Sequence, residues 1–302
     1  MTKKIVLGTG VAMIAALAFV SPPQGEARLA LRPGAVWWRA SHAPTHWPAA
    51  DQRVRGAVQW RPGQAGVEWA ELPIAGRGEA RAIKLVIARI DPQMTRLHLV
   101  WGLDASGDRP AWTVGQADSA AVALNAGMFV DALPWGWVVL DGRERLAPGT
   151  GPLSSALIGL QDGSLAWVDG DDVSAWRSRR DVAFAFQSYP TLLTADGQVP
   201  TALIEPGAIN LSHRDARLAI GLDRAGRLLV VLTRLDSDLP GVDRIPFGLT
   251  VPEMAAVMGA LGARQAMLLD GGISAQLAVR DSSGAVQRWE ALRKVPLGLV
   301  AR

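Results

Sequence analysis

The stretch Leu268-Leu269-Asp270-Gly271-Gly272-Ile273-Ser274-Ala275 changes abruptly from an apolar run to small and polar residues. The segment Ala123-Leu124-Asn125-Ala126-Gly127-Met128-Phe129 changes in the same way. Such a pattern predicts a buried strand that ends in a tight, glycine-containing loop. A carboxylate, an amide, a hydroxyl and several backbone N–H groups could then converge on one polar ligand.

The segments around these loops predict an α+β fold, in which mixed sheets built largely from hairpins and a few helices form a single domain. Two hairpins are clear, at 155–168 and 217–233, because apolar runs flank short polar turns. A further antiparallel pair is expected between 82–90 and 96–101. One helix is expected over 251–261, where Thr250 and Glu253 can form a capping box and Gly262 can end the helix.

The chain is expected to begin with a secretory signal peptide over residues 1–27. Two lysines precede a 16-residue apolar stretch, and small residues follow at 25–27. An uncleaved membrane anchor is the alternative, although the stretch is short for a bilayer span of about 20 residues. Residues 28–65 show little periodicity and are expected to form an irregular N-terminal arm, followed by the folded domain over 66–302.

The composition narrows the chemistry. The chain has 302 residues, 49% of them hydrophobic, so a sizeable core is possible. It contains no cysteine, which excludes thiol catalysis, iron–sulfur clusters and Cys-ligated zinc. The formal net charge is only +3 and the arginines are dispersed, so nucleic acid is not expected as a partner.

Four segments in order resemble the phosphodiester glycosidase family, whose members include enzymes that uncover mannose 6-phosphate. The resemblance covers about residues 66–300 and is closest to the bacterial exported branch. It departs from the family pattern at two positions, Tyr189 and Ile273, where glycine is usual. The four segments are Asn125 to Phe129, Ala185 to Leu193 (Ala-Phe-Gln-Ser-Tyr-Pro-Thr-Leu-Leu), Arg217 to Gly221 (Arg-Leu-Ala-Ile-Gly) and Asp270 to Gly272.

The resemblance implies catalytic roles for Asp270 and Asn125. Asp270 follows an apolar strand, and a partly desolvated carboxylate can act as a general acid, a nucleophile or a metal ligand. The plain alternative is that it braces its own loop. No second carboxylate stands out, and Asp131 and Asp223 are the nearest candidates.

Further residues are expected to bind the substrate. Arginine can grip a phosphate with two parallel hydrogen bonds, backbone N–H groups near glycines can form an anion nest, amides suit sugar hydroxyls, and an indole can stack on a sugar. Each of these residues also has a structural alternative, such as a surface salt bridge, a tight turn, a capped strand end or core packing. Arg214 is expected to remain a surface charge. The expected substrate-binding residues are Gln187, Ser188, Arg217, Gly271, Gly272, Ser274, Gly127, Phe129 and Trp135.

The sequence thus predicts an exported, periplasmic or secreted hydrolase that cleaves a sugar-1-phosphate linkage in a glycosyl phosphodiester of a cell-envelope polymer. The expected partner is a carbohydrate or sugar phosphate, without stable membrane insertion after signal cleavage. No cofactor is expected, and a divalent cation is left open. Two alternatives are a non-catalytic carbohydrate-binding module of the same fold and a serine hydrolase that uses Ser274, with His213 as the base.

Overall fold

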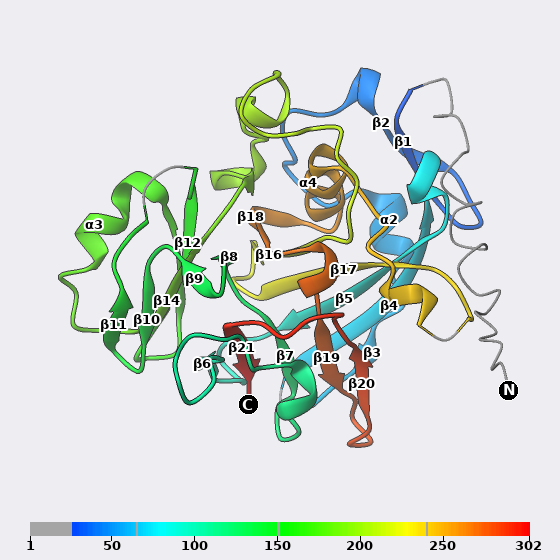
Figure 1. The fold of residues 1–302 in the computed structure, drawn as a ribbon. Coiled ribbons are helices and arrows are strands. Elements are labelled where there is room, and N and C mark those ends of the chain that lie inside the picture. Colours follow the sequence, from blue (N-terminus) through cyan, green and yellow to red (C-terminus); the bar gives the residue numbers. More distant parts are fainter. Residues whose placement is uncertain (1–25, 65, 150–151, 240) are drawn as a thin grey trace, which may run out of the picture.

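The computed structural model describes residues 26–302 except 65, 150–151 and 240 (Figure 1). Residues 1–25 of the expected signal peptide therefore lie outside the described residues. The largest sheet has nine strands. In spatial order they are β15 (Thr191–Leu193), β18 (Ala263–Leu269), β16 (Leu218–Asp223), β17 (Leu228–Leu235), β5 (Ile83–Ile90), β4 (Val67–Ala75), β1 (Arg28–Leu31) and β2 (Val36–Arg39), with β3 (Arg61–Pro62) on β4.

Two five-stranded sheets and one isolated hairpin make up the rest of the β-structure in the described part of the chain. One sheet has the order β11 (Arg143–Leu146), β10 (Val138–Leu140), β14 (Val182–Ser188), β12 (Ser155–Leu160) and β13 (Leu165–Asp169). The other has the order β20 (Val286–Trp289), β19 (Leu277–Arg280), β7 (Val122–Asn125), β21 (Leu297–Ala301) and β6 (Leu97–Trp101). The hairpin consists of β8 (Met128–Val130) and β9 (Leu133–Trp135).

Helices are few and short. In the described residues they are α2 (Gln52–Ala57), α3 (Val173–Trp176) and α4 (Val251–Ala260). Single 3₁₀ turns are η1 (Ala40–His42), η2 (Gly78–Arg81), η3 (Val114–Gln116), η4 (Gly170–Asp172), η5 (Ala195–Gly197), η6 (Thr201–Leu203), η7 (Val242–Arg244) and η8 (Gly272–Ser274). The expected α+β class and the two hairpins at 155–168 and 217–233 are confirmed, and every strand pair among the described residues is antiparallel.

Both faces of the nine-stranded sheet are buried at its centre, which explains why β17 is apolar almost throughout. Leu229 and Val231 face a core shared with α4 and the N-terminal segment. Val230 and Leu232 face a second core shared with the two five-stranded sheets. Figure 1 shows α4 lying over β16 and β18, with the β10–β14 sheet to one side.

Helix α4 begins as the sequence predicts. The Thr250 hydroxyl accepts a hydrogen bond from the Glu253 N–H, and the Glu253 carboxylate accepts one from the Thr250 N–H, which completes the capping box. Gly262 follows the helix with a positive φ of 96°, a conformation that favours glycine. Nearly all of α4 is buried, rather than one face alone, because the N-terminal segment covers its outer side.

Two expectations are corrected. Residues 28–62 are not an irregular arm: β1 and β2 extend the large sheet, and Trp37, Trp38 and Trp47 pack into the core around α4. The strands β5 and β6 do not pair with each other either, because β5 lies between β4 and β17 while β6 pairs with β21 in another sheet. Local sequence shows that a strand forms, but tertiary packing selects its partner.

Within the described part of the chain, no helix combines the length and the apolar character needed to span a bilayer.

Candidate active site

Antiparallel pairing of β16 with β18 creates the candidate site. Leu218 at the start of β16 pairs with Leu269 at the end of β18, so the segment before one strand meets the segment after the other. The Gly272 N–H donates to the Ala216 carbonyl at 2.8 Å. A pocket of about 760 Å³ opens beside this junction. Its lining residues are Glu79, Ser212, His213, Arg214, Asp215, Pro246, Phe247, Asp270, Gly271, Gly272, Ile273, Ser274 and Arg293.

The two glycines after Asp270 allow this close packing. A Cβ atom at Gly271 would lie 2.5 Å from the Ala216 carbonyl oxygen. At Gly272, where φ is +56°, it would lie 2.9 Å from an Asp215 carboxylate oxygen. The Gly272 N–H donates to the Ala216 carbonyl, so this N–H is not free for the expected anion nest.

Asp270 is the central carboxylate of the pocket. Its side chain is 21% exposed, and burial raises the pKa of Asp270 above its ordinary value. Arg293 opposes this shift by donating from Nη2 to the carboxylate at 3.0 Å. The Arg293 Nε also donates to the Ser274 hydroxyl at 2.5 Å, and the nearby Ser274 hydroxyl likewise lowers the pKa of Asp270.

Asp215 supplies a second carboxylate that the sequence interpretation missed. Burial raises the pKa of Asp215, the positive charge of Arg217 lowers it, and the negative charge of Asp270 raises it further. The carboxylate accepts a hydrogen bond from the Ala216 N–H and lies 3.8 Å from the His213 Nε2. The site therefore contains two electrostatically coupled carboxylates in different environments, an arrangement suited to acid–base chemistry.

The two carboxylates suggested by the sequence lie elsewhere. Asp131 is exposed in the turn between β8 and β9. Asp223 accepts hydrogen bonds from Ala225 and Arg227 within the turn after β16, at the end of this strand opposite the pocket. Neither lines the pocket.

Asn125 is close to Asp270, but it contacts the backbone of Asp270 and does not line the pocket. Its side-chain N–H donates to the Asp270 backbone carbonyl at 2.9 Å, and its Oδ1 accepts from the Gln276 N–H at 3.0 Å. The residue is fully buried. Both ends of the amide are engaged with backbone, so these contacts favour a positioning role over the expected catalytic role.

Gln187 and Ser188 do not reach the pocket. The Gln187 Oε1 accepts hydrogen bonds from the backbone N–H groups of Trp137 and Gly149. The Ser188 hydroxyl donates to the Leu268 carbonyl at 2.5 Å. Both side chains are buried, so they fix loops and strands instead of binding substrate as expected.

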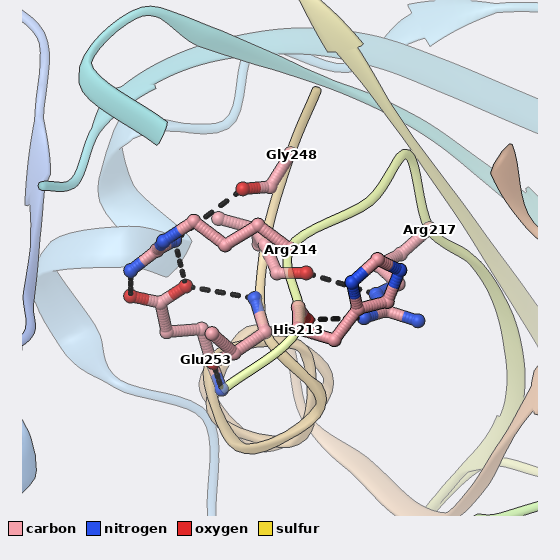
Figure 2. A network of polar contacts seen from close by, with 7 residues as sticks. His213, Arg214, Arg217, Gly248 and Glu253 are labelled. Carbon is pink, nitrogen blue, oxygen red and sulfur yellow. Dashed lines mark hydrogen bonds and ion pairs between the residues drawn. The ribbon is translucent and has the colours of Figure 1, made fainter. Parts of the chain in front are cut away.

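The Arg217 side chain likewise bonds backbone carbonyls and does not line the pocket. Its Nε donates to the Leu249 carbonyl and its Nη2 to the His213 carbonyl (Figure 2). Arg214, expected to be a surface charge, forms a two-fold ion pair with the fully buried Glu253 of α4 and also donates to the Gly248 carbonyl. These contacts fix the segment that carries Asp215.

The first motif contributes contacts around the Asp270 loop. The Gly127 carbonyl accepts a hydrogen bond from the Asp270 N–H at 2.9 Å. The Phe129 ring lies 6.0 Å from the Arg293 guanidinium carbon. Trp135 is half-buried on β9 and does not line the pocket, so the expected stacking of a sugar on it finds no support.

The phosphodiester glycosidase family model matches residues 118–302. The chain belongs to the phosphodiester glycosidase family. The matched region contains Asp215, Asp270 and Arg293. The strands β4 and β5 precede it in the sequence, yet they complete the nine-stranded sheet of this family member.

One solved structure shows that this fold occurs in another protein. The catalytic domain of zebrafish N-acetylglucosamine-1-phosphodiester alpha-N-acetylglucosaminidase, auto-inhibited by its pro-peptide, has 17% identity and a TM-score of 0.56, over 83% of this chain and 86% of that one. A hypothetical protein from Synechocystis has 16% identity and a TM-score of 0.48. The match covers 78% of this chain and 62% of the Synechocystis chain. No curated protein matches the sequence.

Three charged pocket residues of this phosphodiester glycosidase were not predicted from the sequence. In the sequence, neither Asp215 nor Arg293 belongs to a glycine-rich motif, and Glu79 lies in η2, before the matched region. The nearest signal was the polar run before β16, which contains Asp215. Glu79 and Arg293 line the same pocket because segments far apart in the sequence pack together. No local sequence pattern predicts such packing.

A metal site was left open by the sequence. Across the described ranges of this family member, no three His, Asp or Glu side chains come together in a way that could hold a metal ion.

Proposed function

We propose that this phosphodiester glycosidase is a hydrolase that cleaves the bond between a sugar and a phosphate in a glycosyl phosphodiester. The proposed substrates belong to the cell envelope, and envelope polymers are one example. The observation that carries the proposal is the presence of Asp270, Asp215 and Arg293 in one pocket of a family member. The carboxylates can perform chemistry at the sugar, and the guanidinium can stabilise charge on the phosphate.

In the proposed reaction, water adds to the anomeric carbon while the bond from that carbon to the phosphate oxygen breaks. Asp270, oriented by Arg293 and Ser274, acts at the anomeric carbon or positions the water. Asp215 is the second acid–base group and takes up or returns the proton of the water. The products are the free sugar and a phosphate monoester.

The phosphate monoester is already a good leaving group, so strong protonation of it is less important than in ordinary glycosidases. Arg293 is the cation placed to interact with the departing phosphate. Its guanidinium is 45% exposed and donates to Asp270 with one edge. The sequence predicted that Arg217 would bind the phosphate, but the Arg217 guanidinium donates to the Leu249 and His213 carbonyls instead.

A serine hydrolase finds less support in the geometry. The Ser274 hydroxyl accepts a hydrogen bond from Arg293, whereas His213 lies beside Asp215. A Ser–His pair is needed to activate the nucleophile in that class. A carbohydrate-binding module without turnover remains the alternative that the assay below tests.

Export is part of the proposal. It rests on the charged start and apolar stretch within residues 1–27, and it places the mature N-terminus near Arg28. Mass spectrometry of the protein recovered from its native envelope tests this, because an intact Met1 in the membrane fraction would contradict cleavage.

The decisive assay uses a panel of sugars joined through phosphate to p-nitrophenol. Cleavage at the anomeric carbon releases p-nitrophenyl phosphate, which added phosphatase converts to the coloured phenol. In a separate reaction in ¹⁸O-labelled water without phosphatase, the label should appear in the sugar and not in the p-nitrophenyl phosphate. Binding without turnover would favour the binding module, and labelling of Ser274 by a fluorophosphonate would favour the serine hydrolase.

A further inference from the structure

Two large apolar side chains are exposed next to the charged part of the pocket. Ile273 lines the pocket and is 44% exposed, and Leu292 is 57% exposed. The Leu292 N–H donates to the Ile273 carbonyl at 2.9 Å, which holds the two residues side by side. Grouped apolar side chains that remain in water commonly mark a binding surface.

The polar pair Ser274 and Arg293 directly follows the apolar pair Ile273 and Leu292 along the same two segments. Ser274 and Arg293 are joined by a hydrogen bond, and each is the next residue after Ile273 and Leu292, respectively. A ligand whose phosphate contacts Arg293 therefore meets Ile273 and Leu292 one residue away. Pro246 and Phe247 also line this pocket and extend its apolar surface.

We propose that the phosphate of the substrate carries an apolar alcohol, with an alkyl or isoprenyl chain, and that Ile273 and Leu292 recognise that chain. This inference rests on the proposed function and specifies its leaving group. The sugar occupies the side of Asp270 and Asp215, the phosphate contacts Arg293, and the chain leaves over the two apolar residues. A lipid-linked sugar of the envelope has this chemistry, whereas a glycerol-linked repeat lacks the apolar part.

The reaction remains a hydrolysis with this substrate. Water supplies the new anomeric hydroxyl and a proton, the carbon–oxygen bond to phosphate breaks, and the leaving group departs as an alkyl or isoprenyl phosphate. No oxidant, reductant or other co-reactant is required.

Binding of small phosphates tests the inference without depending on turnover. Hexyl phosphate, below its micellar range, is compared with glycerol phosphate by calorimetry on the full folded protein. Burial of one CH₂ group corresponds to about 0.8 kcal/mol, or roughly fourfold in affinity. We expect hexyl phosphate to bind at least about 10-fold more tightly, which requires burial of less than two such groups.

The variants Ile273→Ser and Leu292→Ser should each bring the ratio of the two dissociation constants towards one, while Ile273→Val should largely retain it. Met94→Ser is the matched control, because Met94 is 67% exposed and lies outside the pocket. Equal binding of both phosphates, no binding of either, or a ratio unchanged by the two serine variants would overturn the proposal. The proposed function fails separately, if no glycosyl phosphodiester with any aglycone is hydrolysed.

Discussion

Arg293 donates from Nη2 to the Asp270 carboxylate at 3.0 Å and from Nε to the Ser274 hydroxyl at 2.5 Å. The first contact joins residues 23 positions apart. It keeps a carboxylate that burial would tend to protonate beside a fixed positive charge. The pair therefore combines a group that can act at a sugar with a group that can hold a phosphate.

Replacing Asp270 with Asn should abolish most of the activity while leaving the fold intact. The change keeps the size of the side chain but removes its charge and its acidity. We expect hydrolysis to fall by on the order of 10²-fold or more, the scale for loss of an acid–base group. Asp131→Asn is the matched control at an exposed carboxylate outside the pocket. A fully active but less stable Asp270→Asn variant would show that this residue only braces its loop.

The two arginines should respond differently to substitution by Lys. Arg293→Lys loses the planar fork next to Asp270, so KM should rise on the order of 10-fold or more. Arg217→Lys loses bonds to the Leu249 and His213 carbonyls, so its main effect should be a lower melting temperature. Steady-state kinetics and thermal unfolding of both variants decide this. A rise of KM in Arg217→Lys alone would restore the phosphate-binding role to Arg217.

Asn125→Ala should reduce both stability and kcat. It leaves the Asp270 carbonyl and the Gln276 N–H without their partner, at a cost of about 1–3 kcal/mol per buried group. Gln187→Ala is the matched control, because it also removes a buried amide. The Gln187 amide accepts hydrogen bonds from two backbone N–H groups, and neither belongs to the Asp270 loop. Both variants should unfold more easily, but only Asn125→Ala should lose turnover per folded molecule. Equal turnover in the two would argue against positioning by Asn125.

Asp215→Asn should reveal the pH dependence of stability. Burial raises the pKa of Asp215 above the ordinary value of 3.8. Just above this value the folded protein therefore holds more protons than the unfolded chain, and stability falls as the pH rises through the folded pKa. The variant lacks this loss, so its melting temperature relative to wild type should increase from about pH 4 to about pH 7. Unfolding curves that keep a constant difference would contradict the raised pKa.

Separating the Arg214–Glu253 pair should destabilise the protein strongly. Glu253 is fully buried and Arg214 is 18% exposed, so Arg214→Met leaves a buried carboxylate without its main counter-charge. A loss of about 3–5 kcal/mol in the free energy of unfolding is expected. The double variant with Glu253→Gln should recover part of it. Denaturant unfolding measures both, and an additive loss in the double variant would show that the two residues are not coupled.

Local patterns were sufficient for much of the fold and for one part of the site. The capping residues Thr250 and Glu253 predicted the start of α4, because the hydrogen bonds involved span only three residues. The change from Leu269 to Asp270 predicted a strand end with a carboxylate in a cleft, because apolar periodicity and glycine both act locally. The prediction of an irregular arm over 28–65 was wrong, because β1 and β2 are defined by their partners in the large sheet.

The sequence by itself determined the fold class, most of the strands, the main helix, the family resemblance and the position of Asp270 at the end of a buried strand. Only the tertiary structure decided which polar groups share the pocket. It placed Asp215 and Arg293 there and turned Asn125, Gln187 and Arg217 towards backbone partners. The physical reason is that a strand fixes where a side chain begins, whereas its hydrogen-bond partners and its burial depend on segments that pair from far along the chain.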